Sequence, residues 1–218
     1  MLYTALLYTP EKEHTRYLVD FKLEALAEQV RFQARALGIA QVSELIAVTD
    51  GGNGLEEALQ RHLAEDVTTI LDWYHAAEHL GDFAKALHPC DEEARGQWRV
   101  QATDILYEQG GEALLTHLHA FELPPRSSAH VCEELRKLIG YFENNRHRTD
   151  YPSYRQKGWD IGSGPTEAGC KIIGERLKGS GMRWVEDGAA TVAALRALYV
   201  SGGKLWDGFW SQTRRRAA

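Results

Sequence analysis

The chain has 218 residues, of which 44% are hydrophobic and 26% are charged, a composition that excludes an intrinsically disordered or fibrous protein. Its formal net charge of -6 counts against a protein dedicated to nucleic acid, because such proteins gain affinity mainly by neutralising phosphates. The charge is uneven, since residues 171–218 carry nine Lys and Arg against four Asp and Glu, a local balance of +5. A solvated helix face gives the same pattern.

The cysteines and the hydropathy pattern bear on the compartment. Cys90, Cys132 and Cys170 stand far apart and are odd in number, so they indicate neither a disulfide framework nor a tetrahedral zinc motif. No apolar run approaches the roughly 20 residues of a membrane span. Charged Glu11 and Lys12 come too early for a signal peptide. We therefore expect a cytoplasmic protein without a membrane partner.

The first third of the chain alternates between strand and helix patterns, which predicts an α/β fold. In chain order the apolar residues predict a strand over 2–8, a helix over 21–37, a strand over 45–48, a helix over 54–63 and a strand over 67–71. This order requires at least some parallel pairing in the sheet.

The pattern changes after His75. Residues 75–147 contain no convincing strand, and their Leu, Ala, Glu and His content predicts helices. Residues 151–163 read as a loop, and helices resume over 165–200 with an interruption at 179–181. We divide the chain into an N-terminal part of the core (1–75), a helical insertion (76–158) and a C-terminal helical part of the core (159–218).

Three acidic residues occupy places where the backbone changes direction. Asp50 ends an apolar run and precedes two glycines, and Asp72 ends the next apolar run. Glu167 falls in the first turn of a helix opened by Gly164-Pro165. Such carboxylates suit a divalent-metal site for phosphoryl transfer, because Mg2+ takes hard oxygen ligands. Each also has a purely structural interpretation, as a turn residue for Asp50, a helix N-cap for Asp72 and a dipole-favoured carboxylate for Glu167.

Four segments in order carry a family resemblance: TDGG, LDWYHAAEHL, IGSGPTEAGCKIIGERLKGSGMRW and ALRALYVSGG. Together they resemble the C-terminal part of DDE-type insertion-sequence transposases of the ISKra type, relatives of the Mutator-like group. The match covers nearly the whole chain. The resemblance implies an RNase H-like core interrupted by a helical insertion, and an acidic triad that binds two Mg2+ or Mn2+ ions. It further implies strand cleavage and joining at the ends of a mobile element, with transposon-end and target DNA as partners.

By this resemblance Asp50 matches the second catalytic acid of the family and Glu167 the third, both as metal ligands. The first acid, on the central strand of the family's core, has no counterpart, since Asp20 precedes a helix and lacks an Asp-Gly strand setting. We therefore expect a truncated frame or one part of a split product that has no strand-transfer activity alone. The active complex is expected to be a homo-oligomer that is nucleoid-associated when bound to DNA.

Other residues are assigned supporting roles. His75 could orient Asp72 or contact the scissile phosphate, although a capping or packing histidine is more common. Lys171, Lys178 and Arg183 follow Glu167 and could hold DNA phosphates. Trp184 could stack on a base or close the core.

Two alternatives remain open. Residues 75–79 match the H-x-x-E-H pattern of zinc metallopeptidases, in which His75 and His79 would bind zinc, Glu78 would act as general base and Glu143 could be the further ligand. The chain could also be a non-catalytic DNA-binding remnant of a transposase.

Overall fold

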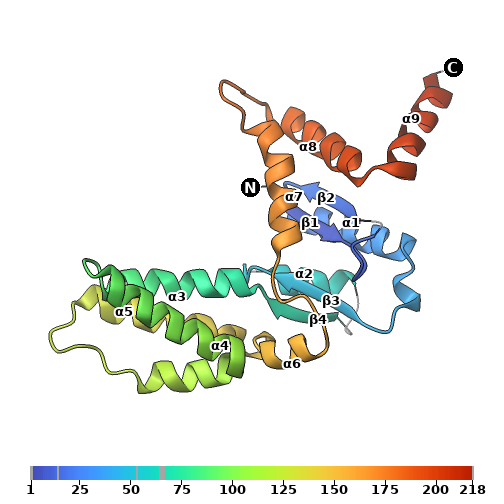
Figure 1. Ribbon diagram of the computed structural model, residues 1–218. Coiled ribbons are helices and arrows are strands. Elements are labelled where there is room, and N and C mark those ends of the chain that lie inside the picture. The colour runs from blue at the N-terminus through green and yellow to red at the C-terminus, as the bar shows by residue number, and fades with distance from the viewer. Residues whose placement is uncertain (1, 14, 53, 64–66, 218) are drawn as a thin grey trace. The chain divides into compact units, whose positions relative to one another are not determined.

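The computed structural model describes residues 2–13, 15–52, 54–63 and 67–217, with side chains as far as residue 212. It is an α/β structure in which helices predominate (Figure 1). Its contacts divide into two units. The first unit comprises Met1–Leu45, Gly54–Val67 and Gly164–Ala218, and the second comprises Ile46–Asn53 and Thr68–Ser163.

The first unit is built on an antiparallel hairpin. Strands β1 (Tyr3–Leu7) and β2 (Arg16–Asp20) pair so that Ala5 lies opposite Leu18. Because successive side chains of a strand point to opposite faces, Leu18 and Val19 enter different clusters. Leu18 packs with the buried face of α1 (Leu23–Ala36), and Val19 packs with Ile173, Ala193 and Ala197. The hairpin is thus covered by helices on both faces.

The remaining helices of the first unit pack around this hairpin. Val19 meets Ile173 of α7 (Gly164–Leu177) and two alanines of α8 (Glu186–Ser201). Helix α2 (Leu55–His62) lies on α1, where Arg61 and His62 pair with Glu24. Two further elements complete the unit, the 3-10 turn η1 (Ile39–Gln41) and the last helix α9 (Gly203–Ala217).

The second unit contains a parallel strand pair. Strands β3 (Leu45–Thr49) and β4 (Val67–Leu71) form a two-stranded sheet. The backbone N–H of Asp72 donates to the carbonyl of Thr49 at 2.7 Å, so both strands end at the same edge of the sheet. Strands whose carboxyl ends meet in this way run parallel, as the strand, helix, strand order of the sequence predicts.

Helices cover this strand pair and build the larger core. The core centres on Ile70, Leu71, Leu80, Phe142 and Tyr151, which are all fully buried. The helical elements are α3 (Trp73–Leu87), α4 (Glu92–Ala120), α5 (Ala129–Asn145), the 3-10 turn η2 (Arg146–Arg148) and α6 (Tyr151–Gln156). Among the described residues, no helix is both long enough and apolar enough to cross a membrane.

The structure confirms the α/β class, the strands near 45–49 and 67–71, and the helical character of residues 75–147. The predicted loop over 151–163 is wrong at its start. Residues Tyr151–Gln156 form α6, because the Asp150 side chain accepts from the Ser153 N–H and Pro152 stands in the first turn. The described strands form two two-stranded sheets. The RNase H-like core and the boundaries at residues 75 and 158 stay predictions.

A close contact inside α4 generates the first testable prediction. Gly110 breaks the helix with φ 83°, and a β-carbon at Gly111 would lie 2.0 Å from Thr149 Oγ1. Thr149 is 1% exposed, so it has no room to move away. We expect Gly111→Ala to lower the free energy of unfolding by about 2 kcal/mol in urea denaturation.

The matched control is Gly140→Ala in α5, where a β-carbon meets nothing within 4 Å. There the change should leave stability unaltered or raise it by up to about 1 kcal/mol, as in any helix interior. Equal effects of the two substitutions would contradict the contact at Thr149.

Candidate functional site

Asp72 is the buried centre of the site in the second unit. It follows β4 and caps α3, with Oδ1 accepting from the Tyr74 N–H at 2.9 Å. Its other oxygen, Oδ2, accepts from the hydroxyl of Ser163. The residue is 0% exposed, and a buried carboxylate is tolerated only where donors satisfy its oxygens. The N-cap interpretation of Asp72 is therefore confirmed, and its second oxygen has a further structural bond.

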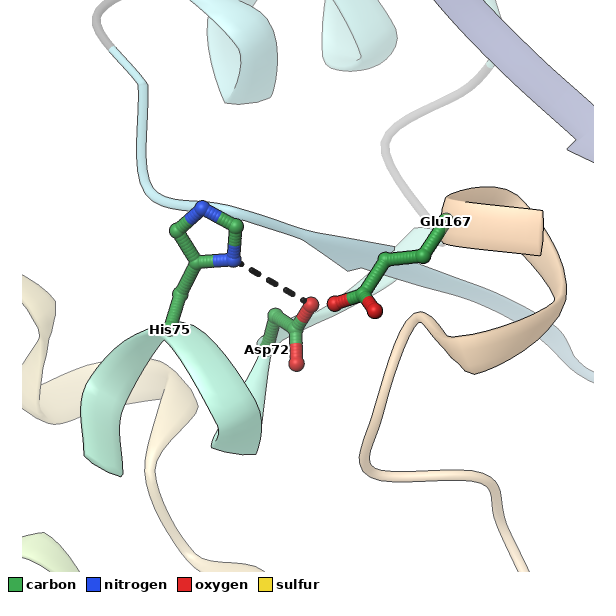
Figure 2. A group of neighbouring side chains, drawn as sticks. All are labelled: Asp72, His75 and Glu167. Atoms are coloured by element: carbon green, nitrogen blue, oxygen red, sulfur yellow. Dashed lines mark ion pairs between the residues drawn. The ribbon is translucent and has the colours of Figure 1, made fainter. Parts of the chain in front are cut away.

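His75 lies one turn further along α3. Its Nδ1 is 3.5 Å from Asp72 Oδ2, the pair marked by the dashed line in Figure 2. The side chain of His75 is 40% exposed. This separation is longer than an ordinary hydrogen bond, so the attraction is mainly electrostatic and requires a protonated imidazole. The structure thus brings His75 to Asp72, as the sequence predicted, and leaves part of its ring accessible to solvent.

Asp50 stands at the end of the neighbouring strand. The pairing of Thr49 with Asp72 puts the residues that follow β3 and β4 at one edge of the sheet. Asp50 is exposed, and its Oδ1 accepts from the Gly52 N–H at 2.9 Å. Among the described residues its Oδ2 has no hydrogen-bond or ion-pair partner. In the described structure one carboxylate oxygen of exposed Asp50 is therefore unbonded, whereas both oxygens of Asp72 are engaged.

A tyrosine and an arginine back the turn that follows β3. A β-carbon at Gly51 would lie 3.2 Å from the Tyr141 hydroxyl and 3.5 Å from Arg148 Nη2. Burial raises the pKa of Tyr141 to about 12; the positive charge of Arg148 opposes this shift, and the charges of Asp50 and Asp72 reinforce it. Both carboxylates act on the Tyr141 hydroxyl, which agrees with the position of Asp50 and Asp72 at the same edge of the sheet.

Sequence reasoning missed Tyr141, Arg148 and Ser163. The GSG motif contains Ser163, and its position before a helix offered a signal that could have marked it as a donor to an acid. Arg148 lies 99 residues from Thr49, its hydrogen-bond partner, so no local pattern points to it. Tyr141 stands within an amphipathic helix and looks like any half-buried aromatic residue.

Glu167 belongs to the first unit. It lies in the first turn of α7, as Figure 2 shows and as the Gly-Pro opening predicted, and it is exposed. An acidic side chain at this place is favoured by the helix dipole. Its convergence with Asp50 stays a prediction.

The predicted DNA contacts all lie on the surface of the first unit. Lys171, Lys178 and Arg183 are exposed, and none of them has an ion-pair partner among the described residues. Trp184 is 43% exposed, and its indole N–H donates to the Leu177 carbonyl at 3.0 Å. The alternative that Trp184 closes the core is wrong, because the bond to the end of α7 holds its ring at the surface.

The zinc-peptidase pattern does not assemble. The ring of His79 lies against Tyr141 with centroids 3.9 Å apart, and burial lowers the pKa of His79. Glu143 pairs instead with His119 at 3.3 Å. Across the described ranges, no group of three His, Cys, Asp or Glu ligands includes His79. The geometry does not favour this alternative.

Two aspartates cap helices in different environments, Asp72 buried and Asp91 exposed, and this difference allows a test of the buried site. Asp72→Ala removes the cap and leaves the Ser163 hydroxyl and the Tyr74 N–H without an acceptor, so we expect a loss of about 2–4 kcal/mol in urea denaturation. Asp91 caps α4 in the same way from an exposed position, with the Ala94 N–H at 2.9 Å. Asp91→Ala should cost only about 1 kcal/mol. A loss no larger for Asp72→Ala than for this control would refute the role of burial.

Comparison of the chain with protein-family models, with the curated proteins and with solved structures finds no match.

Proposed function

We propose that the chain is part of a transposase that uses divalent metal ions to cut and join DNA at insertion-sequence ends. The observation that carries the proposal is the difference between two aspartates at one edge of a parallel strand pair. Asp50 is exposed, and one of its oxygens bonds no other described residue, while Asp72 is buried with both oxygens bonded. A metal ligand must offer a lone pair to an ion that solvent can deliver, so Asp50 fits the ligand role and Asp72 the supporting role.

The order of elements supports an RNase H-like core for this proposal. The antiparallel hairpin of β1 and β2 is followed by α1, β3, α2 and β4, and β4 runs parallel to β3. Glu167, exposed at the start of α7, supplies the last carboxylate.

The donor set suits Mg2+ or Mn2+. Asp50 and Glu167 offer carboxylate oxygens, which such ions prefer, and both are exposed. Divalent ions held there would polarise the scissile phosphodiester and stabilise the departing oxygen. Asp72 keeps the strand ends in place, because its backbone N–H donates to the Thr49 carbonyl, and His75 lies beside its carboxylate.

The reaction needs no covalent enzyme intermediate. Water attacks the phosphorus at the element end, the bond to the 3' oxygen breaks, and that oxygen takes up a proton to become a 3'-hydroxyl. The hydroxyl then attacks a phosphodiester of the target, and the displaced 3' oxygen is released in the same way. Positioning the DNA strand is therefore the main task of the protein.

Exposed cations on the first unit support DNA as the partner. Lys171, Lys178 and Arg183 form no ion pair with any other described residue, so binding a phosphate breaks no ion pair seen in this part of the chain. Trp184, held at the surface by its bond to Leu177, offers a ring face for a base. A homo-oligomer and association with the nucleoid belong to the same proposal.

Metal binding tests the role of Asp50. We expect the purified chain to bind Mn2+ weakly in titrations followed by electron paramagnetic resonance, and Asp50→Asn to weaken binding about tenfold or more. Asp82→Asn is the control, because Asp82 is exposed on α3, where it pairs with Lys85. Stoichiometric zinc that His79→Ala removes would instead favour the peptidase, and Mn2+ binding unaffected by Asp50→Asn would contradict the proposal.

Salt-dependent DNA binding tests the basic surface. In fluorescence anisotropy with a duplex oligonucleotide, Lys178→Gln and Arg183→Gln should each weaken binding and reduce the slope of log affinity against log salt by about 1. Lys85→Gln, which removes an exposed lysine on α3, should leave both quantities unchanged. Unchanged slopes in all three variants would exclude this surface as the DNA-binding site. DNA binding that survives Asp50→Asn would show that DNA binding is independent of the metal site.

A further inference from the structure

We infer that Arg148 and Tyr141 are positioning residues that hold the Asp50 turn in the geometry needed for metal binding. The inference rests on the proposed function, in which Asp50 is a metal ligand. It assigns a role to residues of α5 and η2, which the acidic motifs do not include.

Arg148 connects the end of β3 to the helical part of the second unit. Its Nη1 donates to Thr49 Oγ1 at 2.9 Å, and its Nε donates to Asn145 Oδ1 at 2.9 Å. The side chain is only 4% exposed. A guanidinium offers donors in a rigid fork, so it can bond both partners at once. Because Thr49 directly precedes Asp50, this contact fixes the backbone from which the Asp50 side chain leaves the strand.

Asn145 is itself held in place. Its amide donates to the Tyr141 carbonyl at 2.7 Å, and 6% of the residue is exposed. The chain of bonds therefore runs from α5 through Asn145 and Arg148 to Thr49. Buried polar networks of this kind have one arrangement that satisfies all members, which makes them rigid supports.

The Tyr141 hydroxyl lies against the turn on the same side as Arg148. The turn requires glycine at position 51, where φ is +78° and a β-carbon would lie 2.9 Å from Leu71 Cδ1 and 3.2 Å from Tyr141 Oη. The hydroxyl is buried and has no hydrogen-bond partner among the described residues. Leaving such a donor unpaired destabilises the fold, so packing alone would favour phenylalanine. The Tyr141 hydroxyl is destabilising where it stands, yet it lies beside the turn that carries Asp50. We therefore assign it a role when Asp50 binds a metal ion.

The Gly52 amide reports on this turn without any metal. It donates to Asp50 Oδ1, so its chemical shift and its hydrogen exchange follow the placement of the carboxylate. Selective labelling with 15N-glycine makes the signal observable in the full chain, and Gly96 on the exposed face of α4 provides an internal reference.

The experiment compares Thr49→Val, Arg148→Lys and Tyr141→Phe with wild type. Thr49→Val removes only the acceptor, Arg148→Lys keeps the charge but loses the fork, and Tyr141→Phe removes only the hydroxyl. We expect faster exchange at Gly52, unchanged exchange at Gly96, and Mn2+ dissociation constants raised about tenfold for the first two variants. Thr49→Val and Arg148→Lys both remove the bond between Arg148 and Thr49, so their effects should not add in the double variant. Tyr141→Phe should weaken Mn2+ binding while its melting temperature stays equal to wild type or rises, which a merely structural role would not produce.

Controls match each change. Tyr107→Phe removes a hydroxyl from a half-buried ring elsewhere in the second unit, and Arg136→Lys alters an exposed arginine of α5 that pairs with Glu133. Neither should alter the Gly52 signal or Mn2+ binding. The inference is overturned if Thr49→Val and Tyr141→Phe leave the Gly52 signal unchanged, or if they alter it without affecting Mn2+ affinity in a chain that binds the ion. If the wild-type chain binds no Mn2+ but the variants still alter the Gly52 signal, the positioning role is supported and the proposed metal site is rejected.

Discussion

The buried carboxylate of Asp72 is the constraint on which the second unit depends. With no exposed surface, it must find all its donors inside the protein, and the available donors come from the first turn of α3 and from Ser163. Backbone hydrogen bonds join the same segments, because the Asp72 N–H donates to the Thr49 carbonyl and the Trp73 N–H donates to the Ile161 carbonyl. Two strands, a helix and the segment that follows α6 are therefore fixed to one another at a single junction.

That junction explains why two aspartates in similar sequence settings have different chemistry. Both follow a short apolar strand, and both accept a bond from the backbone two residues later. After β4 the chain turns directly into α3, which buries Asp72 beneath its own helix. After β3 two glycines keep the chain in a turn, and Asp50 stays exposed. Burial thus separates a structural carboxylate from one that can exchange solvent for a metal ion.

Local patterns predicted most of the elements, because apolar spacing and caps act within a few residues. They also predicted that Asp50 and Asp72 end neighbouring strands, since the strand, helix, strand order permits few topologies. The α6 helix was missed because its Asp150 cap and its proline looked like loop residues. Arg148 could not be found, because its contact with Thr49 spans 99 residues and its own surroundings in the sequence are simply polar. The separation of the strands into two pairs depends on such distant contacts as well.

The net charge of -6 does not argue against a DNA partner once screening is considered. At physiological ionic strength the Debye length is about 8 Å, so a phosphate senses mainly the charges nearest to it. Lys171, Lys178 and Arg183 lie within the part of the chain that has a local excess of positive charge, and they have no acidic partner in the described structure. Many of the acids of the second unit are instead neutralised in pairs, such as Glu133 with Arg136 and Asp82 with Lys85. The distribution of unpaired charge, and not its sum, decides where a polyanion can bind.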